Sequence, residues 1–195
     1  LASVLVLSLA VAAAIVLTGP LHHRWSGDKA GSGVQKHHDG SPPRVGALPI
    51  LAACWLGYFL SKGALSAADH GVLGTLLLCC MPAALIGLLE DVTKVVRARR
   101  RLLFPALGAA ASAYSIGVLV PAIGVPGLDQ LLGWLPFALA FTVFMVVGFT
   151  QAMNIIDGLN GLSSGVGILM MLATSAAAYG AGDVLIAQAS LIVAL

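Results

Sequence analysis

Charged residues are scarce in this 195-residue chain: Asp, Glu, Lys and Arg make up 9% of it, against about 25% in an ordinary soluble domain. Its three cysteines all stand in apolar runs, which leaves no disulfide framework and no Cys-x-x-Cys metal site. Ten basic and eight acidic residues give a net charge of only +2, too small an excess for a nucleic-acid-binding surface. With 59% hydrophobic residues and a mean hydropathy of +0.99, these absences exclude a water-soluble globular domain and indicate an integral membrane protein.

Apolar runs divide the chain into membrane-spanning segments, each of which needs about 20 residues to cross a bilayer. The first run lacks a clear signal-peptide cleavage site and is expected to be a transmembrane helix. The last run is still apolar at the final residue, so the chain is expected to be a fragment whose C-terminal part is missing. The runs are 1–19, 46–60, 71–89, 102–120, 132–153, 162–178 and 184–195. They predict an all-α fold, a polytopic transmembrane bundle of six full spans plus a truncated seventh, as one membrane-embedded domain over residues 1–195.

Basic residues fall almost entirely in two loops, 20–45 and 90–101, and Lys62 is the only one elsewhere. Alternating spans place both loops on one side of the membrane, and the positive-inside rule assigns that side to the cytoplasm. The N-terminus is then expected outside, and the segment 154–161 lies on the cytoplasmic face.

Acidic residues avoid the middle of the spans, where transporters and proton relays place them. Glu90 and Asp91 end the third span and Asp157 follows the fifth, so the predicted topology brings them to one face with both basic loops. Adjacent carboxylates suit Mg²⁺ held together with substrate phosphates, and arginines offer paired donors to phosphate oxygens. Two plainer interpretations stay open: the arginines as a topology anchor facing lipid headgroups, and Asp157-Gly158 as a structural turn.

Three motifs, each at a predicted cytoplasmic end of a span, carry a family resemblance. The first is a basic and His-containing loop from Lys36 to Ala47, and the second runs from Gly87 to Asp91 and continues with Arg100-Arg101-Leu102. The third is Asn154-x-x-Asp157-Gly158-x-Asn160-Gly161-Leu162. In residue types and order they resemble the polyprenyl-phosphate N-acetylhexosamine-1-phosphate transferases, glycosyltransferase family 4. The chain departs from that pattern at Glu90, Gln151 and Asn160, where the family often has Asp, Asn and Asp.

The resemblance implies a reaction of EC 2.7.8 type at the cytoplasmic face of the bacterial inner membrane. A HexNAc-1-phosphate passes from a UDP-sugar, UDP-GlcNAc or a derivative, to undecaprenyl phosphate, and UMP is released. The implied metal is Mg²⁺, with Mn²⁺ as the alternative, and a homodimer is left open. The departures favour surface-polysaccharide or O-antigen synthesis over the peptidoglycan branch. The rival hypothesis is a non-catalytic or transporter-type polytopic membrane protein.

The resemblance also assigns roles to individual residues. The implied catalytic residues are Asp91, Glu90 and Asp157, and the implied metal ligands are Asn154 and Asp157. The implied substrate-binding residues are Arg100, Asn160, Lys36 and His37. Because the family pairs two aspartates, Glu90→Asp is expected to be neutral or mildly activating.

Overall fold

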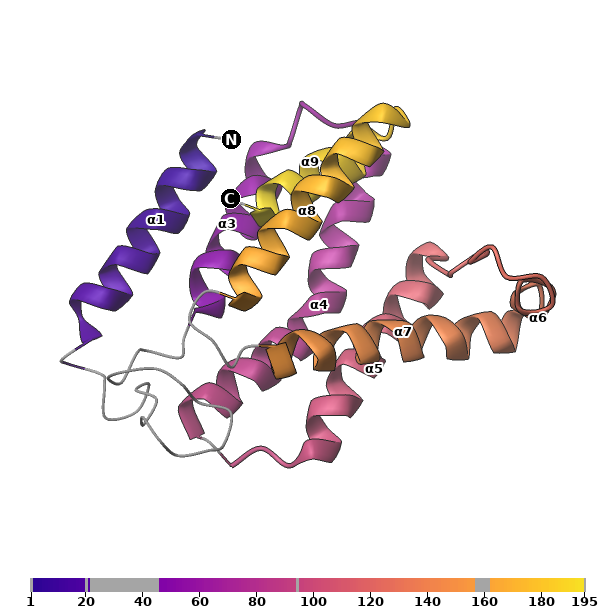
Figure 1. The fold of residues 1–195 in the computed structure, drawn as a ribbon. Coiled ribbons are helices and arrows are strands. Elements are labelled where there is room, and N and C mark those ends of the chain that lie inside the picture. Colours follow the sequence, from indigo (N-terminus) through magenta and orange to yellow (C-terminus); the bar gives the residue numbers. More distant parts are fainter. Residues whose placement is uncertain (1, 20, 22–45, 94, 157–161, 195) are drawn as a thin grey trace.

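The computed structural model describes residues 2–19, 21, 46–93, 95–156 and 162–194, and within them the regular secondary structure is entirely helical (Figure 1). The helices are α1 (Ala2–Leu17), α3 (Ala47–Leu60), α4 (Ala67–Thr93), α5 (Ala98–Ile116), α6 (Leu128–Leu132), α7 (Leu135–Ile156), α8 (Leu162–Gly180) and α9 (Val184–Ala194). Each apolar run of the sequence coincides with one of the longer helices. The short helix α6 was not expected. The prediction of an all-α fold is confirmed for the described residues.

In the part of the chain that the structure describes, three helices are long and apolar enough to cross a membrane, and they are α4, α7 and α8. The helices α1, α3 and α9 are apolar but have 16, 14 and 11 residues, fewer than the roughly 20 that a bilayer needs. Helix α5 has 19 residues, but Arg99, Arg100 and Arg101 occupy its N-terminal end. The chain is therefore an integral membrane protein, and the expected six full spans stay a prediction beyond these three helices.

The helices pack as neighbouring pairs around α4 (Figure 1). Helix α1 lies against α3, which also contacts α4 and α9, and α9 packs along α8. Helix α5 packs against both α4 and α7, and α7 runs across them in Figure 1. As a result, the C-terminal ends of α4 and α7 meet the N-terminal end of α5 at one end of the bundle.

Glycines allow the closest of these helix contacts. A Cβ atom added at Gly108 of α5 would overlap the carbonyl oxygen of Cys79 on α4. A Cβ atom added at Gly57 of α3 would lie 2.8 Å from Cδ1 of Ile192 on α9. Lipid tails are as apolar as the side chains, so helices in a membrane associate by close backbone approach at small residues. These glycines therefore determine how near α5 and α9 come to their neighbours.

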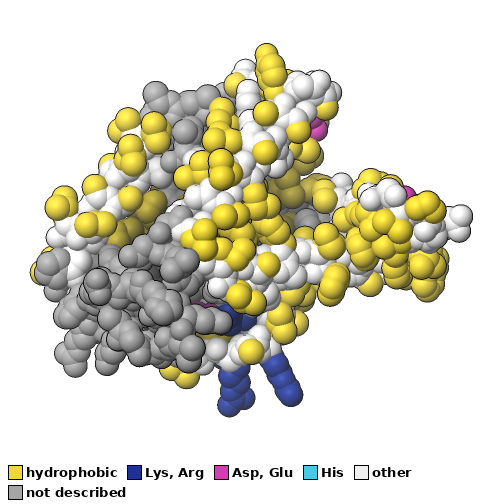
Figure 2. Space-filling view, viewed as in Figure 1, with side chains coloured by type: hydrophobic (Ala, Val, Ile, Leu, Met, Phe, Trp, Pro, Cys, Tyr) yellow, Lys and Arg dark blue, Asp and Glu magenta, His cyan; other side chains and the backbone are white. Residues whose placement is uncertain are grey.

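Hydrophobic side chains cover much of the described part of the face shown in Figure 2. On the membrane-length helices, Phe144 of α7 is 69% exposed and Leu169 of α8 is 70% exposed. Large contiguous apolar surfaces are unfavourable in water and mark contact with a membrane or a partner. Basic side chains instead project at the end of the molecule where α5 begins. The charged end of the bundle is thus the end where α4, α5 and α7 converge.

Candidate active site at the ends of α4, α5 and α7

Arg101 connects three helices at the charged end of the bundle. Its Nη1 atom donates a hydrogen bond to Oε1 of Glu90 on α4 at 3.0 Å. Its Nη2 atom donates to Oε1 of Gln151 on α7 at 3.5 Å, and Nε2 of Gln151 donates to the carbonyl oxygen of Arg101 at 3.2 Å. We call Glu90, Arg101 and Gln151 the polar junction. Its hydrogen bonds join residues up to 50 positions apart along the chain.

Pro105 explains why the carbonyl group of Arg101 is available to Gln151. In an α-helix, the N–H group of residue 105 would donate to the carbonyl oxygen of residue 101. Proline has no N–H group, so this intrahelical bond cannot form. Pro105 lies inside α5, and Gln151 supplies the hydrogen bond that the helix itself does not. The local sequence of α5 therefore creates an acceptor that faces α7.

The ion pair of the polar junction is partly shielded from solvent. The Arg101 and Glu90 side chains are 30% and 27% exposed. At this exposure the pair is expected to contribute about 1 kcal/mol or less, close to the range of surface pairs. The ion pair matters more for charge, because the guanidinium of Arg101 compensates the negative charge of the Glu90 carboxylate within the protein. Asp91, the next residue, carries the second carboxylate of the motif.

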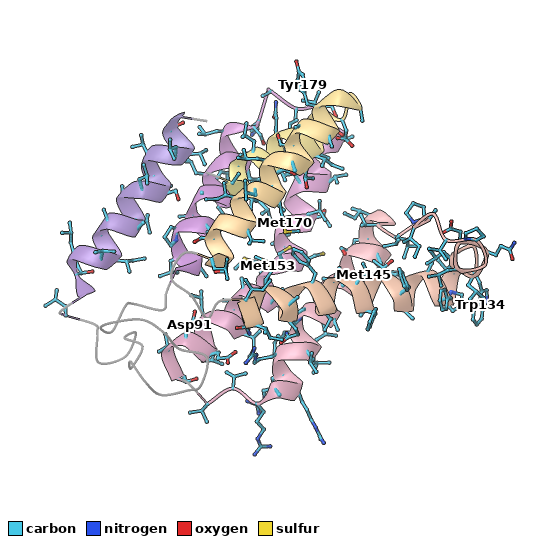
Figure 3. All side chains as sticks on the ribbon, in the orientation of Figure 1. Asp91, Trp134, Met145, Met153, Met170 and Tyr179 are labelled. Atoms are coloured by element: carbon cyan, nitrogen blue, oxygen red, sulfur yellow. The ribbon has the colours of Figure 1, made fainter. Side chains whose placement is uncertain are left out.

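The predicted site residues that the structure describes lie around the polar junction. Glu90 and Asp91 belong to the last turn of α4, Asn154 to the exposed last turn of α7, and Arg100 to the exposed first turn of α5. Figure 3 shows Asp91 near the end of α4. The remaining predicted residues lie outside the described residues, and they are Asp157, Asn160, Lys36 and His37. The roles assigned to all of them stay predictions.

The connection from α7 to α8 follows the helix that carries Gln151. Helix α7 ends at Ile156 and α8 begins at Leu162, so the Asp157-Gly158 motif stands in sequence between them. The two helices contact each other, because a Cβ atom at Gly167 would lie 3.9 Å from Cε of Met153. Met153 is labelled at this end of α7 in Figure 3.

The donor set decides what kind of metal site these helices could form. Among the described residues, no group of three His, Cys, Asp or Glu side chains lies close enough to hold a metal ion. Mg²⁺ does not require such a cage, since one or two carboxylates plus substrate phosphates normally bind it. Asp91 at the end of α4 and Asn154 at the end of α7 carry a carboxylate and an amide oxygen, the ligand types that an ion shared with a diphosphate accepts. They do not fit a closed structural metal site.

Three arginines give this end of the molecule a positive surface. Arg97, Arg99 and Arg100 are exposed and stand at the start of α5, where basic side chains project in Figure 2. A helix N-terminus already carries a partial positive charge, so these cations are unfavourably placed unless an anion is near. The arrangement suits phosphate groups, whether of a substrate or of lipid headgroups.

The sequence pattern did not single out two residues of the junction. In the sequence Arg100 and Arg101 form one basic motif, whereas in the structure it is Arg101 that bonds to both α4 and α7. Gln151 was noted only as a departure from the expected Asn. One signal was present: Pro105 follows Arg101 by four residues, which leaves a helix carbonyl open for a side-chain donor.

Comparison with known proteins places residues 73–195 in the profile of glycosyl transferase family 4. A phospho-N-acetylmuramoyl-pentapeptide-transferase of Pelotomaculum thermopropionicum is 40% identical over 67% of the chain and 44% of its own length. A Bacillus subtilis protein named "Probable undecaprenyl-phosphate N-acetylglucosaminyl 1-phosphate transferase" is 32% identical over 82% of the chain and 43% of its own length. A phospho-N-acetylmuramoyl-pentapeptide-transferase of Streptococcus equi subsp. equi is 30% identical over 77% of the chain and 50% of its length. The chain thus spans about half the length of these relatives or less. No solved structure matches the chain significantly.

Proposed function

The chain belongs to glycosyl transferase family 4, and from this membership we propose that it takes part in transferring a HexNAc-1-phosphate from a UDP-N-acetylhexosamine to undecaprenyl phosphate. The observation that supports this reaction best is the polar junction. Through Arg101 of α5 it links the end of α4, which carries Asp91, to the end of α7, which carries Asn154. Two motifs far apart in sequence are thereby brought to one charged end of an apolar bundle.

The reaction exchanges one phosphoanhydride bond for another. An oxygen of the lipid phosphate forms a bond to the β-phosphorus of the UDP-sugar, and the bond from that phosphorus to its bridging oxygen breaks. UMP leaves with the electron pair, and the sugar becomes joined to the lipid through a diphosphate. Such transfers depend on positioning and on charge stabilisation more than on covalent help from the protein.

The residues of the chain supply positioning and charge. Arg100 at the start of α5 is proposed to bind phosphate oxygens, together with Lys36, His37 and Asn160. Asn154 and Asp157 are the proposed ligands of Mg²⁺, or of Mn²⁺ as the alternative, and the proposed catalytic residues are Asp91, Glu90 and Asp157. When bound, that ion would neutralise the charge of the diphosphate. Glu90, which faces Arg101 at 3.0 Å, is proposed to support Asp91 and not to bind the metal.

The proposed location is the bacterial inner membrane, with this end of the bundle in the cytoplasm. The segregation of basic residues into alternate loops supports that orientation. A water-soluble UDP-sugar and a membrane-embedded lipid phosphate would then meet at the membrane surface, beside the ends of α4 and α7. Six full spans, a partial seventh and a homodimer remain part of the proposal.

The test is a transfer assay on the purified intact protein in detergent with undecaprenyl phosphate and Mg²⁺. UMP release should occur with UDP-GlcNAc, stop with EDTA and return with Mg²⁺ or Mn²⁺. UDP-MurNAc-pentapeptide is the second donor, because the relatives are named for both kinds of sugar. Turnover of that donor alone would place the protein in the peptidoglycan branch instead. Absence of UMP with either donor would contradict the transferase function and favour the transporter-type alternative.

A further inference from the structure

The side chain of Gln151 contacts a single residue of α5 at two points. Its Nε2 atom donates to the backbone carbonyl of Arg101 at 3.2 Å, and its Oε1 atom accepts from the guanidinium at 3.5 Å. An amide has one donating and one accepting end, so both ends are used on Arg101. Two bonds from one planar group restrain the separation of α5 and α7 and also their relative rotation.

The polar junction lies directly beside the motif residues on both outer helices. Gln151 and Asn154 are three residues apart on α7, which places them one turn apart on the same helix face. Glu90, which receives the other end of the Arg101 guanidinium, directly precedes Asp91 on α4. The chain of contacts from Gln151 through Arg101 to Glu90 therefore connects the turn that carries Asn154 with the turn that carries Asp91.

We propose that Gln151 is a positioning residue for sugar-phosphate transfer, acting through Arg101 to set the distance between Asp91 and Asn154. The inference rests on the proposed function. Pro105 contributes to this positioning, because it leaves the carbonyl oxygen of Arg101 free of a bond within α5 and so available to the Gln151 amide. A metal and a diphosphate held between two helices need their ligands within a fraction of an ångström, and a misplacement of about 1 Å can cost 100-fold in rate.

Gln151→Met tests the inference in the intact protein, because it keeps the length of the side chain and removes both hydrogen bonds. We expect kcat to fall about 10- to 100-fold, the Mg²⁺ concentration for half-maximal activity to rise, and KM for the UDP-sugar to change little. Gln151→Glu keeps the acceptor for Arg101 but loses the donor, and should give a smaller loss. Gln188→Met in α9 is the matched control, since it removes a membrane-helix glutamine outside the junction.

Pro105→Ala separates positioning from structural support. Alanine restores the N–H group at residue 105, which competes with Gln151 for the Arg101 carbonyl and adds a bond within α5. If Gln151 acts by positioning, Pro105→Ala should have a lower kcat and a melting temperature that is unchanged or higher. A purely structural contact predicts that activity and melting temperature change together.

The outcomes decide between the possibilities. If the wild-type protein turns over and Gln151→Met has the same kcat, the inference is overturned and the proposed function stays intact. A parallel fall of kcat and melting temperature in Pro105→Ala and Gln151→Glu would also overturn it. If Gln151→Met fails to insert, the other two variants decide on their own. Absence of turnover in the wild-type protein would instead refute the proposed function.

Discussion

The guanidinium of Arg101 lies 3.0 Å from the carboxylate of Glu90, so an ion pair joins the last turn of α4 to the first turn of α5. This contact gives a physical reason for Glu at a position where the family's motif has Asp. The side chain must reach across to a neighbouring helix, and the additional methylene of Glu provides that reach. The length of the Glu90 side chain thus allows its ion pair with Arg101.

Shortening Glu90 to Asp should break the ion pair, since Asp is shorter by about 1.5 Å, the length of one carbon–carbon bond. We expect a loss of about 0.5–1 kcal/mol in stability, because the pair is partly exposed and such pairs are weak. The pairing of aspartates in the family instead predicts that Glu90→Asp leaves kcat unchanged or raises it mildly. Thermal unfolding and kcat of the intact protein, with Glu90→Gln as the variant of equal length, distinguish these expectations. Undiminished stability in Glu90→Asp would show that the ion pair is not needed.

Removing the charge of Asp91 or Asp157 should lower kcat far more than it lowers expression or membrane insertion. Asp91→Asn and Asp157→Asn keep the side-chain shape but remove a charge beside the proposed metal and diphosphate. Electrostatic stabilisation of this kind is worth about 10²–10³ in kcat. The measurement is UMP release at saturating Mg²⁺ and UDP-sugar.

Asp69 and Asp183 provide matched controls for these substitutions. Asp69 accepts a hydrogen bond from the Ser66 hydroxyl at 2.7 Å, and Asp183 accepts one from the Ile186 N–H group at 2.9 Å. Asp69 stands at the end of α4 away from the site, and Asp183 lies between α8 and α9, past the C-terminal end of α8. An Asn carbonyl oxygen can accept the same bonds. Their Asn variants should retain normal turnover. Normal turnover in Asp157→Asn as well would identify the Asp157-Gly158 segment as a structural turn.

Enlarging Gly108 should separate α4 from α5. The added methyl group of Gly108→Ala would overlap the carbonyl oxygen of Cys79, which is backbone and cannot rotate away. We expect a destabilisation of about 1–3 kcal/mol, as for other overpacked contacts. Thermal unfolding in detergent measures it. Gly148→Ala in α7 is the control, because nothing lies within 4 Å of a Cβ atom there. Equal melting temperatures for the two variants would contradict the close approach of α4 and α5.

Cysteine labelling tests the orientation in the membrane. In a background with Cys54, Cys79 and Cys80 replaced by alanine, Ala98→Cys at the start of α5 should react with an impermeant maleimide only after permeabilisation. Ala64→Cys, an exposed position before α4, should react from outside. Ala64 is chosen because it leaves the Ser66–Asp69 hydrogen bonds intact. Labelling of position 98 from outside would reverse the orientation and remove the cytoplasmic site.

Much of the fold follows from local properties of the sequence. Long uncharged runs can avoid exposing their backbone to lipid only as helices, because a helix satisfies its N–H and C=O groups within the segment. For that reason, every predicted span coincides with a helix of the structure. The family could also be predicted, because its motifs consist of residues near each other in the chain. The family profile confirms this resemblance. The short α6 was missed, since five residues do not produce a recognisable apolar period.

Tertiary structure decided which polar residues meet. Arg100 and Arg101 are equivalent in the sequence, and only the packing of α5 between α4 and α7 turns Arg101 toward Glu90 and Gln151. Gln151 is 50 residues from Arg101, and no local rule relates residues at that distance. The bond between them requires two further conditions, a carbonyl opened by Pro105 and a helix crossing that brings the amide to it. Hydrophobic length thus determined the helices from the sequence alone, and local motifs determined the family, whereas helix packing determined that Arg101 pairs with Glu90.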